Sequence, residues 1–161
     1  EAEPSFSVDG KSVVFVTWND ENSGAIYTVN LDGSELKKIT QEKGIYRMPT
    51  YNNSGTKMAF VKEEGNSDQG FDYTKNTGIY IANADGSEAK LVSKTGEFPQ
   101  FSADDKRIFF QTGGEFFGGL TKKLMSVDLQ GKEERSHISS KLANRLVPSK
   151  DNNWIAFIQL H

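Results

Sequence analysis

Few side chains in this sequence are of the types that perform catalysis or hold a metal ion. The 161 residues include no cysteine and two histidines, His137 and His161. The motifs G-x-S-x-G, H-E-x-x-H and G-x-x-x-x-G-K, which mark a nucleophile elbow, a zinc site and a phosphate-binding loop, do not occur in it. Neither a nucleophile with a positioned base nor a histidine metal cluster can be assembled from this stock without another chain. We therefore expect no catalytic residue, no metal site and no cofactor.

The acidic residues offer little more. Asp32-Gly33 and Asp85-Gly86 look like parts of calcium loops, but an EF-hand needs a Glu six residues after the Gly, where this chain has Ile39 and Val92. Asp followed by Gly is the usual sequence of a tight hairpin turn. We interpret both segments as turns, and the pair Asp104-Asp105 as solvated surface.

Aromatic and charged side chains gather in the long loops, which is where recognition hot spots concentrate. These loops cover 18–24, 63–78 and 112–122, and shorter connectors before the repeated inner segments add further residues of the same kind. The residues that we expect to bind a partner are Trp18, Tyr46, Arg47, Phe71, Tyr73, Glu97, Phe116, Phe117 and Arg145. Two structural alternatives stay open: Phe98, Phe116 and Phe117 filling gaps in the fold, and Arg47 with Glu97 forming an ion pair.

Charge and hydropathy exclude two classes of partner. There are 19 basic and 22 acidic residues, for a formal net charge of −3, and they are spread evenly, so no basic stripe marks a nucleic-acid interface. No apolar run approaches the roughly 18 residues that span a bilayer, and residues 1–20 contain no signal-peptide core. We expect neither nucleic-acid binding nor a membrane span.

The elements that would position these residues are four copies of one pattern. PSFSVDGKSVVFV begins at Pro4, PTYNNSGTKMAFV at Pro49, PQFSADDKRIFFQ at Pro99 and the weaker LVPSKDNNWIAFI at Leu146, at intervals of 45, 50 and 47 residues. Each copy reads as an inner segment, a polar turn and an apolar strand that ends on Phe15, Phe60, Phe110 or Phe157. We expect these four Phe side chains to be buried in equivalent positions.

Three strands follow the inner segment in each complete copy. The expected ranges are 12–17, 25–31 and 36–40, then 58–61, 78–84 and 89–93, then 107–111, 123–129 and 135–139, and finally 155–158. Four strands at a period of 40 to 50 residues, without helical periodicity, are typical of propeller blades. A β-sandwich is the rival, but its strands do not usually recur in self-similar groups of four.

The sequence therefore predicts an all-β fold: a β-propeller of four-stranded antiparallel blades, here about three and a half of them. Residues 1–161 form a single segment with repeats at about 4–40, 49–93, 99–139 and 146–158. The long loops and the connectors then emerge on one face, which we call the long-loop face. Because a closed ring needs more strands, we expect a piece of a longer protein, self-association, or an arc that another chain completes.

P-x-F-S-x-D-G-K before the apolar strand, followed by I-Y-x-x-N-x-D-G-S-E, resembles the TolB-type (WD40-like) β-propeller repeat over nearly the whole chain. Ser54-Gly55, Asp104-Asp105 and Pro148 depart from the pattern. The resemblance implies a periplasmic or extracellular location. It also implies a non-catalytic scaffold that binds a protein or peptide on its long-loop face. The alternative it implies is the propeller of a larger hydrolase (peptidase or amidohydrolase type) or of a polysaccharide lyase, lining an active site that other sequence supplies.

Overall fold

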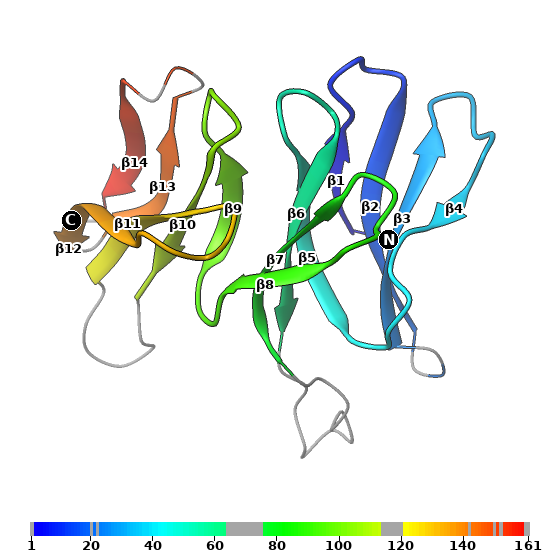
Figure 1. The fold of residues 1–161 in the computed structure, drawn as a ribbon, viewed down its shortest axis with the longest axis horizontal. Coiled ribbons are helices and arrows are strands. Elements are labelled where there is room, and N and C mark those ends of the chain that lie inside the picture. Colours follow the sequence, from blue (N-terminus) through cyan, green and yellow to red (C-terminus); the bar gives the residue numbers. More distant parts are fainter. Residues whose placement is uncertain are drawn as a thin grey trace.

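A computed structural model describes residues 2–19, 21, 23–63, 76–113, 121–141, 143–149, 151 and 153–159. These residues form three four-stranded antiparallel sheets and a two-stranded one, and each sheet is hydrogen-bonded in chain order (Figure 1). No helix occurs among them, and none is therefore long and apolar enough to cross a membrane. The predicted all-β architecture of antiparallel blades is confirmed.

The strand bounds follow the repeats closely. Blade 1 consists of β1 (Ala2–Phe6), β2 (Ser12–Asn19), β3 (Ser23–Asn30) and β4 (Lys37–Lys38). Blade 2 consists of β5 (Ile45–Tyr51), β6 (Lys57–Glu63), β7 (Gly78–Asn83) and β8 (Lys90–Ser93). Blade 3 consists of β9 (Glu97–Phe101), β10 (Arg107–Thr112), β11 (Thr121–Asp128) and β12 (Arg135–Lys141). A separate half-blade consists of β13 (Ala143–Pro148) and β14 (Ile155–Gln159). The predicted outer strand 36–40 shortens to two residues, whereas the expected weak strand 135–139 extends to seven.

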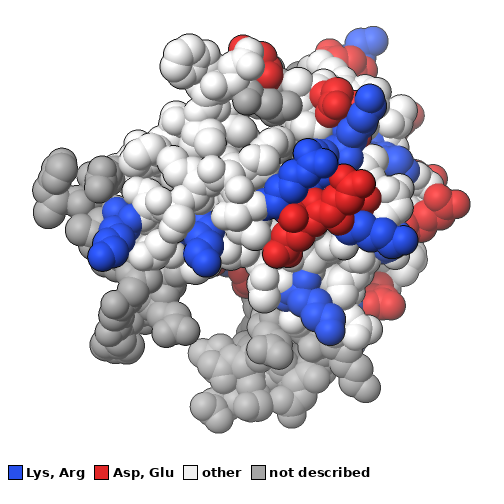
Figure 2. All heavy atoms as spheres, turned by 60° about the vertical axis from the view of Figure 1, so that its left-hand side comes forward, with Lys and Arg blue, Asp and Glu red and all other residues white. Residues whose placement is uncertain are grey.

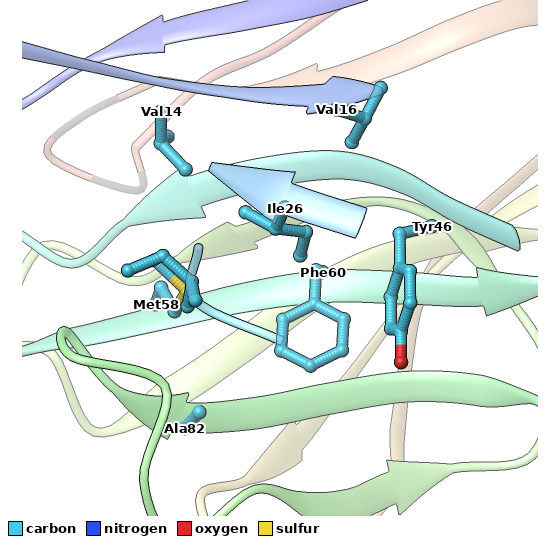
Figure 3. Close-up of a cluster of buried hydrophobic side chains, with 8 residues drawn as sticks. Val14, Val16, Ile26, Tyr46, Met58, Phe60 and Ala82 are labelled. Atoms are coloured by element: carbon cyan, nitrogen blue, oxygen red, sulfur yellow. The ribbon is translucent and has the colours of Figure 1, made fainter. Parts of the chain in front are cut away.

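The core consists of the layers between successive blades. Val14, Val16 and Ile26 of blade 1 face Met58 and Phe60 of blade 2 in one cluster (Figure 3). A second cluster joins blades 2 and 3, and a third joins blade 3 to the half-blade. Because successive strand residues point to opposite faces, each central strand needs apolar residues at consecutive positions to fill both layers. This requirement explains the unbroken apolar runs of the sequence.

The prediction of four equivalent buried Phe side chains is half right. Phe60 and Phe110 are 4% and 1% exposed, each in a layer between two blades. Phe15 is half-buried and Phe157 is 40% exposed, so the prediction is wrong for these two. Phe15 lies on the side of the first sheet that no described blade covers. Phe157 points to the same side as Ile155, toward blade 3, but it belongs to a sheet of only two described strands, so it has fewer neighbours than Phe60 or Phe110.

Basic and acidic side chains are intermixed on part of the described surface (Figure 2). Figure 2 shows one face on which Lys and Arg side chains lie among Asp and Glu side chains on the right of the view, while isolated Lys and Arg side chains stand in a largely uncharged region on the left. This arrangement agrees with the even spread of charge along the sequence.

Candidate functional site

The connector between blades 1 and 2 lies against the long-loop end of blade 1. Gly44 in the connector forms a β-bridge with Gly24 at the start of β3, and the Gly24 N–H donates to the Gly44 carbonyl oxygen at 2.8 Å. A Cβ on Gly24 would lie 3.4 Å from the Trp18 ring and closer still to the Gly44 oxygen. Glycine is therefore needed at position 24, and the bridge brings the connector beside Trp18.

A first hollow, of about 280 Å³, opens at this junction between β2 and β5. Trp18, Tyr46 and Arg47 all line it, together with Glu3 of β1. Three residues that the sequence singled out thus share one site. The Arg47 guanidinium is fixed there, because its Nε donates to Glu3 Oε1 at 2.7 Å and its Nη1 lies 3.5 Å from Glu63 Oε2. The hydrogen bond to Glu3 is the main cause of a raised Arg47 pKa.

Tyr46 is mainly a core residue. It is 5% exposed, its ring meets the Phe60 ring edge-on at 5.7 Å, and its hydroxyl donates to the Glu42 carbonyl oxygen. Burial, with a smaller contribution from the Glu42 carboxylate, raises the Tyr46 pKa to about 12. Tyr46 therefore shapes the wall of the first hollow and presents little surface of its own.

A second hollow, of about 290 Å³, adjoins the first through Glu3. It is lined by residues of all four inner strands, including Glu3, Met48, Phe98 and Arg145. The Met48 N–H donates to Glu3 Oε2 at 2.6 Å, and the Phe98 N–H donates to the Met48 sulfur at 3.2 Å. The Arg145 guanidinium lies over the Phe98 ring, 5.1 Å from its centroid, a cation–π contact.

Glu97 stands apart from this group. Its carboxylate lies 3.7 Å from Lys122 Nζ, within blade 3, and Arg47 has Glu3 and Glu63 as its ion-pair partners. Arg47 and Glu97 thus form no direct ion pair, although the Glu97 charge is a minor cause of the raised Arg47 pKa. The other four predicted binding residues, Phe71, Tyr73, Phe116 and Phe117, lie outside the described residues.

A third pocket, of about 220 Å³, lies between blades 1 and 2. Its walls include Tyr46, Phe60 and Tyr80, and the Lys62 ammonium is buried among them, 2.7 Å from Glu42 Oε2 and 5.9 Å from the Tyr80 centroid. The hydrogen bond from Lys62 also lowers the Glu42 pKa. This ion pair satisfies the buried ammonium.

A serine and a histidine do meet in blade 3, which the sequence had not suggested. Ser126 Oγ lies 2.8 Å from His137 Nε2, and Arg107 Nε donates to the same oxygen at 3.0 Å. Ser126 is completely buried. A substrate cannot reach this hydroxyl, so the pair is a structural hydrogen bond and not a nucleophile with its base. Within the described ranges, no three His, Cys, Asp or Glu side chains are placed to hold a metal ion.

Sequence reasoning missed Glu3 and Met48, which are as central to the hollows as Arg47 and Arg145. Glu3 lies just before the first copy of the repeat motif, which begins at Pro4, and Met48 looks like an ordinary apolar residue. A signal was present, since Glu3, Met48, Phe98 and Arg145 occupy the same place in the four copies, one residue before Pro4, Pro49, Pro99 and Leu146.

Blades arranged around inner strands, with side chains converging where those strands begin, define a propeller with an axial site. The family described as TolB beta propeller domain matches residues 1–159, and the chain belongs to this family. The Tol-Pal system protein TolB of Francisella tularensis subsp. mediasiatica is 30% identical over 92 residues, which cover 57% of this chain and 19% of that protein.

Two solved structures show the same fold. A putative TolB from Agrobacterium tumefaciens has a TM-score of 0.64 at 20% identity, covering 83% of this chain and 47% of that one. An oligogalacturonate lyase in complex with manganese has a TM-score of 0.68 at 17% identity, covering 94% of this chain and 46% of that one. The chain thus spans less than half the length of these relatives.

Proposed function

We propose that this chain is a non-catalytic binding segment of a TolB-like propeller, which recognises a protein or peptide on its long-loop face in the periplasm or outside the cell. The observation that carries the proposal is the pair of adjoining hollows on the inner strands. Trp18, Tyr46 and Arg47 line one and Arg145 lines the other, with Glu3 in both. We also propose that residues 1–161 act as one unit in this recognition.

The chemistry of the two hollows suits a protein surface. Aromatic and arginine side chains are enriched among interface hot spots. Arg47 and Arg145 are held in place before any partner arrives, by Glu3 and Phe98 respectively. The matching relative is named as a protein of the Tol-Pal system, which supports a protein partner.

The alternative is a propeller that lines the active site of a larger enzyme, such as a polysaccharide lyase. The fold similarity to an oligogalacturonate lyase favours it, although likeness at 17% identity concerns the fold alone. Under this alternative, the inner strands would contact an oligosaccharide, and catalytic side chains would come from outside the described residues.

Site-directed photo-crosslinking separates the two. A benzoylphenylalanine at Trp18 should give discrete protein adducts in cells, whereas the same residue at Leu31 should give none. Leu31 is 59% exposed and lies after β3, at the opposite end of blade 1. Combining Arg47→Ala with Arg145→Ala should reduce the adducts at position 18 and leave the melting temperature within a few degrees, because exposed charges contribute roughly 0–1 kcal/mol. Equal adducts at both positions would contradict the proposal.

A further inference from the structure

One strained backbone conformation recurs where the four inner strands begin. Glu3, Met48, Phe98 and Arg145 have φ angles of 52°, 54°, 53° and 56°, in the left-handed region that disfavours side chains. Each lies at a bulge in the pairing of its inner strand with the next strand. Such a conformation costs on the order of 1 kcal/mol per residue or more, and clusters of it are found at ligand sites. Here all four line one hollow.

The outer hairpins supply an internal control. Glu35, Glu88 and Glu133 have φ angles of 55°, 54° and 49°, and they too are equivalent residues of successive blades. This outer position keeps the same amino acid in all three blades. The inner position holds an acid, a thioether, an aromatic ring and a guanidinium. The repeated backbone geometry therefore does not dictate which side chain occupies the inner position, and the four different side chains there need another explanation.

Within the second hollow, the Arg145 guanidinium keeps N–H donors that can bind a further group. Glu3 already accepts hydrogen bonds from Arg47 and from the Met48 N–H. Arg145 is exposed and rests on Phe98, and it has no carboxylate partner among the residues that the structure describes. The hollow thus presents a positioned guanidinium beside two apolar side chains, with its acid neutralised.

We propose that the second hollow binds an extended peptide segment of the partner through an acidic side chain, whose carboxylate pairs with Arg145 while a neighbouring apolar side chain rests on Met48 and Phe98. The inference rests on the proposed function and names the chemistry that it recognises. A guanidinium that an aromatic ring holds in place presents paired N–H donors, which suit the two oxygens of a carboxylate.

An acidic side chain fits better than the end of a peptide chain. The hollow is lined by inner strands of all four sheets and opens to solvent, so it can accept a side chain from a peptide that lies across its mouth. The chain itself provides the precedent, because the Glu3 side chain reaches into the same place and binds both a guanidinium and a backbone N–H.

Titration with short capped peptides tests this inference directly. The probes are acetyl-Ala-Leu-Glu-Leu-Ala-amide and its Gln counterpart, followed by NMR chemical shifts or calorimetry on the whole chain. The Glu peptide should bind about ten-fold more tightly than the Gln peptide at low salt, since charge-assisted hydrogen bonds are roughly twice as strong as neutral ones. Arg145→Ala should abolish the difference, and Arg145→Lys should retain part of it.

The matched control is Arg135→Ala, which removes an exposed arginine at the start of the outer strand β12 that pairs with Glu133 in the preceding hairpin. It should leave the preference for Glu intact. Equal binding of the two peptides, a preference that survives in Arg145→Ala, or an uncapped Gln peptide that binds as well as the capped Glu peptide would each overturn the inference. Protein adducts at position 18 would still stand in those cases, so the failure would not be that of the proposed function.

Discussion

Leu146 occupies the position that is Pro4, Pro49 or Pro99 in the other repeats, and so it carries a backbone N–H that they lack. That N–H donates to Gln111 Oε1 at 2.8 Å. Gln111 is itself the exception at its place in β10, where the earlier blades have Val16 and Val61. The two exceptions meet across the interface between blade 3 and the half-blade. A non-proline residue at position 146 has an N–H that needs an acceptor, and Gln111 provides that acceptor.

This pairing predicts a strong coupling between the two positions. Gln111→Val alone should destabilise the fold by about 1–3 kcal/mol, because a buried N–H loses its acceptor. Leu146→Pro alone should also destabilise it, since both polar atoms of Gln111 are then left buried, and Nε2 already has no partner among the described residues. The double variant restores the pattern of the other blades and should recover about 1 kcal/mol or more in a denaturant melt. Additive losses would contradict the pairing.

His137 predicts a dependence of stability on pH. Burial lowers the pKa of His137 below its ordinary 6.5, and Arg107 and Arg135 lower it further. His137 Nε2 lies 2.8 Å from Ser126 Oγ, and Arg107 donates to the same oxygen, so the positive charge of Arg107 is held close to the imidazole. The folded state thus binds this proton less tightly than the unfolded state does.

Stability should therefore be complete above about pH 6.5 and should fall as the pH drops from there toward 5. His137→Gln keeps a hydrogen-bonding partner for the Ser126 hydroxyl but cannot gain a proton. Melting temperatures of the variant should be flatter than those of the wild type over this range. A wild-type melting temperature that does not change between pH 7.5 and 5 would show that the imidazole is not protected by the fold.

The sequence predicted the blades well because repetition exposes the register. It could not tell Phe60 from Phe15, since the two have the same place in the motif and differ only in whether a neighbouring blade covers them. Among the candidate residues, Arg47 and Arg145 were found through their loop positions. Glu3 and Met48 were missed because their role depends on a bulge, and bulge geometry cannot be recognised from residue type alone.

At the level of elements, the hairpins after the third strands of blades 2 and 3 pack tightly against the preceding blade. Gly86 in blade 2 lies so close to the Ile39 carbonyl oxygen that a Cβ could not fit, and a Cβ on Gly131 in blade 3 would lie 2.7 Å from the Val92 oxygen. The equivalent Gly33 in blade 1 has no neighbour within 4 Å. All three have positive φ angles, of 86°, 76° and 83°.

These glycines separate the effect of backbone strain from that of close packing. Gly33→Ala should cost only about 1–2 kcal/mol, since it adds a side chain to a left-handed residue in open space. Gly86→Ala should cost about 1–3 kcal/mol more, because it also forces blade 2 away from blade 1. Urea denaturation of the two variants measures the difference. Equal losses would mean that the blades do not pack as the structure shows.

A second element-level link joins the inner turns. Asp105 takes the place of Gly10 and Gly55, and it adopts a φ of 54°. Its carboxylate accepts hydrogen bonds from the backbone N–H groups of Asn53 and Ser54 in the preceding blade, at 2.8 and 2.9 Å. Burial opposes the charge of Asp105, but these bonds outweigh it and lower the pKa. Asp105, which departs from the repeat pattern, thus joins two successive blades by hydrogen bonds, and we call such a link between blades a clamp.

For the molecule as a whole, the described arc has an apolar surface at each end. At the first blade, Phe15 stacks on Tyr27 as Phe60 stacks on Tyr80, but without a blade over it. At the half-blade, Ile158 is 63% exposed at the place in the repeat where Val16 covers the next blade. Inside the arc, the side of a sheet that carries Val16 packs on the side of the next sheet that carries Phe60. The two exposed ends of the arc are one surface of each kind.

We predict that this 161-residue chain self-associates head to tail at micromolar concentration. Such a contact need not close, so assemblies should grow with concentration. Ile158→Lys should reduce the mass measured by light scattering, whereas Leu36→Lys, which changes an equally exposed residue on a hairpin, should not. A stable monomer with slow amide exchange throughout 155–158 would contradict the prediction.

The clamps between blades also bear on how the chain is made. The bonds from Glu3 to Arg47, from Asp105 to Asn53 and from Gln111 to Leu146 join residues 44, 52 and 35 positions apart, each between one blade and the next. As the chain leaves the ribosome, the surface on which each new blade docks has just been completed. Folding can therefore keep pace with translation from one of these blades to the next, and a pause in synthesis leaves exposed the layer that the next blade will cover.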